Sequence, residues 1–154
     1  MSIYRILKTY EQTLMMVEDV LGSGVTTNTQ LDKLGYMVFG SDYLGTHSSN
    51  EFPKYIRNNQ CFILNTDSSN SKNKTGHWCG FYKVNDKIGN CKLYYYDSFK
   101  RSKNELSKYW INKKMYNANK TDRDQSFLEN SCGSRSFSWL ILMRKFGERA
   151  IDVV

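Results

Sequence analysis

Two apolar segments joined by a short polar turn constrain the fold of this chain more than any other feature. Residues 77–84 and 91–97 are rich in aromatic side chains, and the stretch NDKIGN between them has the composition of a turn. The two segments are therefore predicted to pair as an antiparallel hairpin. Because successive side chains of a strand point to opposite faces, we expect Cys79, Phe81, Leu93 and Tyr95 on one face and Trp78, Tyr82, Tyr94 and Tyr96 on the other.

A hairpin that is apolar on both faces must be covered on both faces, which suits the centre of a sheet. The apolar run at residues 61–64 predicts a third strand, and residues 115–118 predict a further short one. Residues 39–59 are rich in Gly, Ser and Asn and contain Pro53, the only proline, so irregular chain is expected there.

Helices are predicted at both ends of the chain and between the strands. Apolar spacings of three and four predict an amphipathic helix over residues 3–21, with a stripe of Ile3, Ile6, Leu7, Tyr10, Leu14, Val17 and Leu21. Capping boxes predict helices at residues 28–34 (Thr27 with Gln30, ended by Gly35) and from 102 to about 114 (Ser102 with Glu105). A strongly apolar helix is predicted over residues 133–146 and is ended by Gly147.

These elements predict an α+β fold with a mixed, mainly antiparallel sheet flanked by helices. A chain of 154 residues with 40% hydrophobic content can bury one core. We therefore expect a single domain over residues 1–154, to which the helix at about 3–21 is an additional N-terminal element.

Composition excludes several classes of protein. No stretch reaches the roughly 18 apolar residues that a membrane span requires, and the first residues lack the apolar block of a signal peptide. A soluble, intracellular protein with no membrane partner is expected. The four cysteines form no C-x-x-C pair, and no histidine lies at a zinc-ligand spacing, so neither a metal site nor a disulfide framework is predicted.

The formal charge of +7 favours acidic partners such as nucleic acid. The basic residues gather in three groups: Lys100, Arg101 and Lys103; Lys113 and Lys114; and Arg144, Lys145 and Arg149. A solvated basic surface and a nucleic-acid-binding face are both consistent with this pattern.

The hairpin brings a histidine and a carboxylate together. Facing residues of an antiparallel pair have numbers that sum to a constant, and a turn centred near Lys87 makes that constant about 174. His77 then faces Asp97. A carboxylate beside an imidazole fixes its tautomer and stabilises the imidazolium form, although such a pair is more often a structural hydrogen bond than a catalytic one.

The position of one cysteine favours a catalytic role for the His77–Asp97 pair over a structural one. Cys132 immediately precedes an apolar helix, where amide donors and the helix dipole lower the pKa of a thiol. Cys79 is a rival nucleophile because it lies two residues from His77, but side chains at that spacing run parallel and do not aim at one another. We interpret Cys79, like Cys61 and Cys91, as a buried apolar residue.

Two further residues complete the candidate site. His47 and His77 are the only histidines, and His47 is expected in a surface loop with no carboxylate placed beside it. His77 is therefore the preferred base. Gln125 precedes Cys132 by seven residues, and its amide could donate to an oxyanion beside the Cys132 backbone NH.

The order and spacing of these residues match a known pattern. Its elements are Tyr43-Leu44-Gly45-Thr46, Phe52-Pro53, Cys61-Phe62-Ile63-Leu64-Asn65-Thr66, Gly76-His77-Trp78, Tyr96-Asp97-Ser98-Phe99, Gln125 and Ser131-Cys132-Gly133. From about Leu31 to Gly147, the chain thus resembles the adenain family, the maturation proteases of adenoviruses, with relatives in virophages and polinton-type elements.

The resemblance implies a thiol endopeptidase with a papain-like fold of the adenain type. It assigns Cys132 as nucleophile, His77 as base, Asp97 as orienting acid and Gln125 as oxyanion donor, and it places Trp78 beside the substrate channel. It further implies cleavage after glycine in viral capsid precursors during particle maturation, in the host cell cytoplasm and the virion. We expect a monomer that requires no cofactor, with DNA as a stimulating partner.

Two other functions are consistent with the sequence. A protease that removes ubiquitin-like modifiers shares this fold and also cuts after glycine. A basic nucleic-acid-binding protein that keeps the fold without turnover belongs to a different class altogether.

Overall fold

The structure is a computed structural model of the chain. It describes residues 2–22, 26–67, 77–99, 101, 103–106, 110, 113–118 and 131–152. Gln125 and Ser102 lie outside the described residues.

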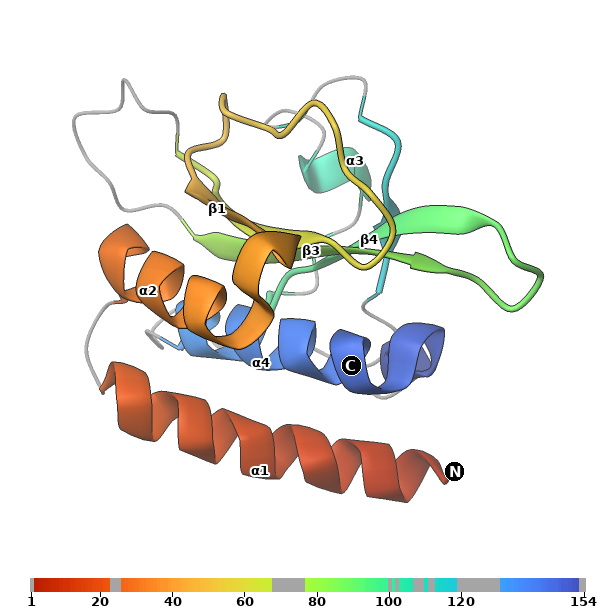
Figure 1. Ribbon diagram of the computed structural model, residues 1–154, viewed down its shortest axis with the longest axis horizontal. Helices are drawn as coiled ribbons and strands as arrows, with labels where there is room; N and C mark the ends of the chain where they lie inside the picture. Colours follow the sequence, from red (N-terminus) through yellow and green to blue (C-terminus); the bar gives the residue numbers. More distant parts are fainter. Residues whose placement is uncertain are drawn as a thin grey trace.

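A single five-stranded sheet organises the described residues (Figure 1). Its strands are β1 (Tyr43–His47), β2 (Cys61–Asn65), β3 (Trp78–Asn85), β4 (Cys91–Tyr96) and β5 (Tyr116–Asn117). They lie in sequence order across the sheet; the inner pairs β2–β3 and β3–β4 are antiparallel, whereas the outer pairs β1–β2 and β4–β5 are parallel. The sheet is therefore mixed, with the predicted hairpin at its centre.

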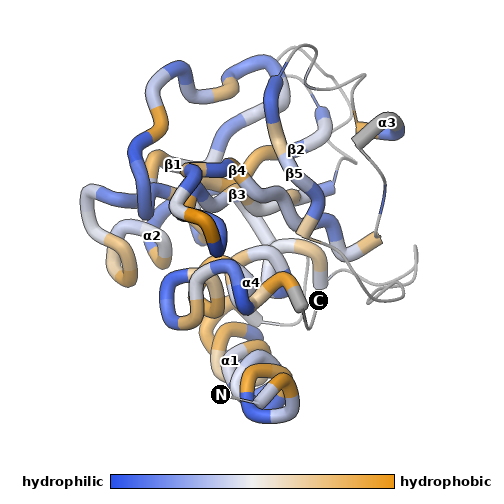
Figure 2. Tube along the Cα trace, turned by 90° about the vertical axis from the view of Figure 1, so that its right-hand side faces the viewer, coloured by the Kyte–Doolittle hydropathy of each residue, from blue (hydrophilic) through white to orange (hydrophobic). Residues whose placement is uncertain are grey.

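Helices cover the sheet unequally. The α-helices are α1 (Ile3–Leu21), α2 (Asn28–Phe39), α3 (Lys103–Leu106) and α4 (Cys132–Phe146), and the 3-10 helices are η1 (Gly40–Asp42) and η2 (Gly147–Asp152). Helix α4 packs on β3, α2 packs on β1, and α1 packs on the outer side of α4. Figures 1 and 2 show these layers on one side of the sheet and α3 on the other. The predicted α+β class is confirmed.

The two faces of the hairpin belong to two separate apolar clusters, as predicted. Tyr82, Tyr94 and Tyr96 pack with α1, α2 and α4, and Trp78 packs against the same cluster. The opposite cluster joins the second face of the hairpin to residues from β2, α3 and the neighbouring loops: Phe62, Leu64, Cys79, Phe81, Leu93, Tyr95, Leu106, Trp110 and Met115. Both faces of the central strands are thus buried.

The predicted register of the hairpin is wrong, because the numbers of facing residues sum to a value two higher than expected. Gly80 pairs with Tyr96 and Asn85 with Cys91, so the facing numbers sum to 176 rather than 174. The turn is centred on Ile88, where the amide of Asp86 donates to the carbonyl of Asn90. An even shift leaves each side chain on its predicted face, but it places His77 opposite Phe99 instead of Asp97.

Helix α2 and strand β1 differ from the prediction. The helix continues through Gly35 to Phe39 because Gly35 is a packing position: a Cβ there would lie 2.3 Å from the ring of Tyr43. Strand β1 forms within residues 39–59, which were expected to be irregular, and Gly45 adopts φ 101° where its register with β2 shifts.

Helix α1 begins and ends as predicted, but its buried stripe is narrower. Ile6, Tyr10, Val17 and Leu21 are buried, whereas Ile3 and Leu7 are 58% and 38% exposed. In the region of the third predicted helix, α3 has one turn and Lys113 and Lys114 are not helical. No helix in the described ranges combines the length and apolar character needed to cross a bilayer.

Gly35→Ala should lower stability although alanine favours a helix by about 1 kcal/mol over glycine. The ring of Tyr43 is 2% exposed and packs against Tyr36 and Phe39, so it has no room to move away from an added methyl group. We expect a net loss of about 1–3 kcal/mol, measured by chemical denaturation. The matched control is Lys33→Ala on the exposed side of α2; equal stability of both variants would contradict this packing.

Candidate active site

Three elements bring His77, Asp97 and Cys132 to one place. His77 directly precedes β3, Asp97 directly follows β4, and Cys132 is the first residue of α4. Because β3 and β4 are antiparallel neighbours, the start of one lies beside the end of the other. Helix α4 packs on β3 where Gly80 leaves room; a Cβ at Gly80 would lie 3.2 Å from the Ser136 carbonyl oxygen.

Asp97 is fully buried and bonded on both carboxylate oxygens. Its Oδ1 lies 2.6 Å from His77 Nε2 and accepts from the amide of Phe99. Its Oδ2 accepts from Nε of Arg101 at 2.5 Å and from the Arg101 amide at 3.3 Å. Burial alone would raise the pKa of Asp97, but the bonds from His77 and Arg101 outweigh it and lower the pKa to about 2. The carboxylate is therefore charged at neutral pH.

The imidazole of His77 is fixed on several sides. Its ring stacks on Phe99 with centroids 4.0 Å apart, and the Ser98 hydroxyl oxygen lies 3.3 Å from Nε2. Its backbone is held as well, since the amide of His77 donates to Thr66 Oγ1 and its carbonyl accepts from the Thr66 amide, both at 2.9 Å. Asp97 and Ser98 thus both contact His77 through Nε2.

Cys132 is half-buried, and the imidazole of His77 is the side chain that most favours its thiolate form. Burial by itself would raise the pKa of this thiol. The interaction with His77, the charge of the imidazolium, and the backbone amides of Trp78 and Gly133 together outweigh burial and lower the pKa.

The pKa of His77 moves in the opposite direction. Burial alone would lower it, but hydrogen bonds to Asp97 and Cys132 outweigh that effect and raise the pKa. Opposite shifts of a thiol and an imidazole favour the thiolate–imidazolium pair, which is the reactive form of a nucleophilic cysteine.

Thr26, between α1 and α2, contacts both residues whose amides hold the sulfur. Its carbonyl accepts from the indole NH of Trp78 at 3.0 Å. Its side chain packs against Gly133, where a methyl group would lie 2.9 Å from Thr26 Cβ. Thr26 is 4% exposed and so is fixed in place. Glycine at position 133 is therefore required by the close approach of Thr26.

The other cysteines have different surroundings. Burial raises the pKa of Cys61 and of Cys79, so both thiols are protonated at neutral pH. Cys91 is exposed at the start of β4, with its thiol 3.5 Å from Asn58 Oδ1. Of Cys61, Cys79 and Cys132, only Cys132 has a thiol pKa below the usual value.

One group of side chains has the composition of a metal site. Donor atoms of His77, Cys79 and Asp97 all lie within 4.8 Å of one another, and all three residues are buried. However, His77 and Asp97 are joined by a direct hydrogen bond, and Cys79 keeps its proton. An ion would have to separate the first pair and deprotonate the thiol, so the arrangement fits a hydrogen-bonded acid–base pair better than a metal centre.

His47 is not in the surface loop that was predicted. It ends β1, is half-buried, and its Nε2 lies 2.7 Å from the carbonyl oxygen of Leu44. The His47 ring thus contacts the backbone of its own strand. Gln125 lies outside the described residues, so its place relative to Cys132 stays a prediction.

Sequence reasoning missed several residues of the site. Arg101 was assigned to the basic surface, but it bonds the buried carboxylate of Asp97. Its spacing of four from Asp97 was a weak signal. Ser98 and Phe99 were named in the family pattern, but without a role at the site. Thr26 lies too far from His77 and Cys132 in sequence for any local pattern.

Comparison of the chain with protein-family models and with curated proteins yields no match. The described residues define an α+β protein in which a cysteine at the first position of a helix lies beside a histidine that a buried aspartate holds.

Asp97→Asn should shift the pH dependence of Cys132 alkylation. Ionised Asp97 favours protonated His77, and protonated His77 favours the thiolate. Removing the charge should lower the pKa of His77 and raise that of Cys132, so the midpoint moves to higher pH. Below the midpoint, the rate should fall about tenfold for each pKa unit. Iodoacetamide labelling at a series of pH values, followed by peptide mapping, measures the midpoint for Cys132.

The control for this variant is Asp86→Asn. Asp86 pairs with Lys92 at the hairpin turn and not with the site. Its alkylation midpoint should equal that of the wild type. An unchanged midpoint in folded Asp97→Asn protein would show that the carboxylate does not control the thiol.

Proposed function

We propose that the protein is a cysteine endopeptidase of the papain-like, adenain-type class. The observation that carries this proposal is the grouping of Cys132, His77 and Asp97. Asp97 is paired with His77, the pKa of the thiol is lowered and that of the imidazole is raised. A structural His–Asp pair needs no thiol beside it at the start of a helix. The paired shifts are what nucleophilic catalysis requires.

The reaction proceeds in two stages. The Cys132 thiolate attacks the carbonyl carbon of the peptide, and the imidazolium of His77 gives its proton to the departing amine as the C–N bond breaks. His77 then takes a proton from water, which attacks the thioester, and cleavage of the C–S bond restores the thiolate. Asp97 holds the imidazole in the required orientation throughout.

Negative charge on the carbonyl oxygen needs donors at the start of α4. The first amides of a helix have no intrahelical partner and point toward its N-terminus. In the proposed site, the Cys132 amide serves as one donor and the side-chain amide of Gln125 as a second. The second assignment rests on the sequence spacing and the family resemblance.

The substrate is proposed from the resemblance to the adenain family. It is a viral capsid precursor cut after glycine during particle maturation, in the host cell cytoplasm and the virion. Trp78 is the proposed wall of the substrate channel; it is half-buried and its indole is anchored on the Thr26 carbonyl. A ubiquitin-like fusion assayed beside capsid precursors distinguishes the two protease functions.

Cys132→Ala should abolish cleavage of a fluorogenic Gly-X peptide, with kcat/KM lower by about 10⁴ or more. The matched control is Cys91→Ser, which changes an exposed thiol at the far end of the hairpin and should leave activity near wild type. Retained cleavage in Cys132→Ala would refute the proposed function. Loss of activity in Cys91→Ser would instead identify Cys91 as the nucleophile.

Gln125→Ala should lower kcat by about 10² to 10³, the usual loss for one oxyanion donor. KM should change less because the donor is aimed at charge that develops in the transition state. Steady-state kinetics on the same peptide measure both. A kcat within about threefold of wild type would indicate that backbone amides alone stabilise the oxyanion.

A further inference from the structure

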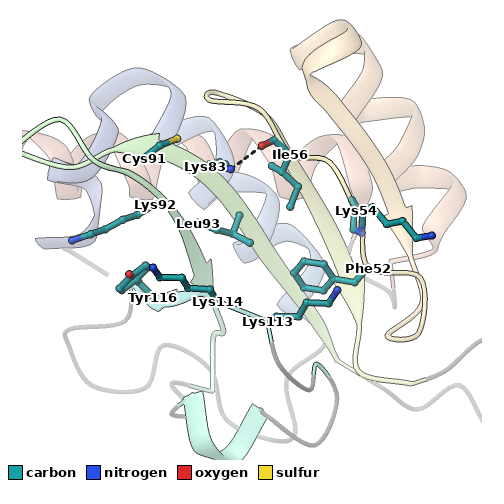
Figure 3. Close-up of a pocket in the computed structure, with 11 residues that line it drawn as sticks. Phe52, Lys54, Ile56, Lys83, Cys91, Lys92, Leu93, Lys113, Lys114 and Tyr116 are labelled. Atoms are coloured by element: carbon teal, nitrogen blue, oxygen red, sulfur yellow. Dashed lines mark hydrogen bonds between the residues drawn. The ribbon is translucent and has the colours of Figure 1, made fainter.

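A pocket of about 270 Å³ lies far from the candidate active site, at the other end of the central hairpin (Figure 3). Its walls come from residues 52–56, the end of β3, the start of β4 and residues 113–116. His77 is six residues from the pocket residue Lys83, which is roughly 20 Å along an extended strand. The pocket is therefore separate from the Cys132 thiol.

The lining of the pocket is strongly cationic. Five of its residues are lysines and none is acidic: Lys54, Lys83, Lys92, Lys113 and Lys114. Outside the lining, Asp86 compensates one of these charges by pairing with Lys92 at 2.8 Å. The remaining ammonium groups repel one another, so a bound anion is favoured by all of them together.

Two of the lysines are oriented by neutral partners. Lys83 is half-buried and donates to the carbonyl of Ile56 at 2.8 Å. Lys113 is also half-buried, and its Nζ lies 4.9 Å from the ring centroid of Phe52. Neither contact neutralises the charge, and each restricts the motion that an ammonium group would lose on binding a ligand.

The floor of the pocket is apolar. Leu93 is 8% exposed, and Phe52 and Ile56 pack with it on the sheet face opposite α4. Figure 3 shows Leu93 between the side chains of Lys83 and Lys113. An apolar floor inside a cationic rim is the pattern of a small-molecule site, and the volume is near the lower end for such sites.

We propose that this pocket binds a small molecule carrying a polyphosphate group, either an inorganic chain or a nucleotide. Phosphate matches the site because it carries up to two charges and several acceptor oxygens, and lysine binds it as a point charge. A concave site with an apolar floor buries a compact ligand, whereas a duplex needs a wider basic face. This inference does not depend on the proposed protease function.

The test is isothermal titration of the full chain with tripolyphosphate and with ATP, without divalent cations. Both probes should bind the wild-type protein at low salt. Lys113→Gln/Lys114→Gln should weaken binding at least about tenfold, by removing two charges from the rim. Equal affinities for the probes assign the site to the inorganic chain, and tighter binding of ATP assigns it to a nucleotide.

The matched control is Lys145→Gln/Arg149→Gln, which removes the same net charge from exposed positions elsewhere. Its affinity should be near wild type, and thermal melting checks that both variants fold. Lys54→Gln, an exposed rim variant, provides a second test if the first one unfolds. Three results would overturn the proposal: no binding of either probe, equal weakening by the rim and control variants, or binding of a short DNA duplex alone.

Discussion

Burying the carboxylate of Asp97 constrains everything around it. An ionised group without water must be matched by charge and hydrogen bonds, and here His77, Arg101 and two backbone amides provide the match. Meeting that requirement orders the chain after β4 and fixes His77 from one side. The thiol of Cys132 then lies beside an imidazole that is held in place and whose pKa is raised. The lowered pKa of the Cys132 thiol therefore depends on the buried charge of Asp97, which acts through His77.

The sheet supplies the geometry that this arrangement needs. Antiparallel pairing of β3 and β4 brings the residues just outside their ends together, and α4 places its first residue beside them. The close approach of α4 depends on Gly80 and on the Ser136 hydroxyl, which donates to the Trp78 carbonyl at 3.0 Å. The three side chains of the candidate site are thus attached directly to the ends of two strands and a helix, which are more rigid than loops.

The local sequence pattern was sufficient to predict the elements in which apolar residues recur at a regular spacing. The bounds of α1 and the faces of β3 and β4 follow from periodicity, and those of α4 from a strongly apolar run that Gly147 ends. Strand β1 could not be seen because its five residues include Gly45 and pair in parallel with a distant segment. Arg101 was not identified because a lysine-rich neighbourhood looks like a solvated surface. Of the proposed site, the sequence located His77, Asp97 and Cys132, whereas the contacts that tune them depend on tertiary packing.

The position of Thr26 links the segment after the N-terminal helix to the candidate site. Thr26 joins the segment after α1 to Trp78 and Gly133, whose amides hold the sulfur, and α1 itself is held mainly by its packing on α4. A helix at the edge of a molecule opens more often than the sheet beneath it. For the proposed function, the support of the two amides would therefore depend on the free energy of local opening of α1. That quantity is no larger than the global free energy of unfolding.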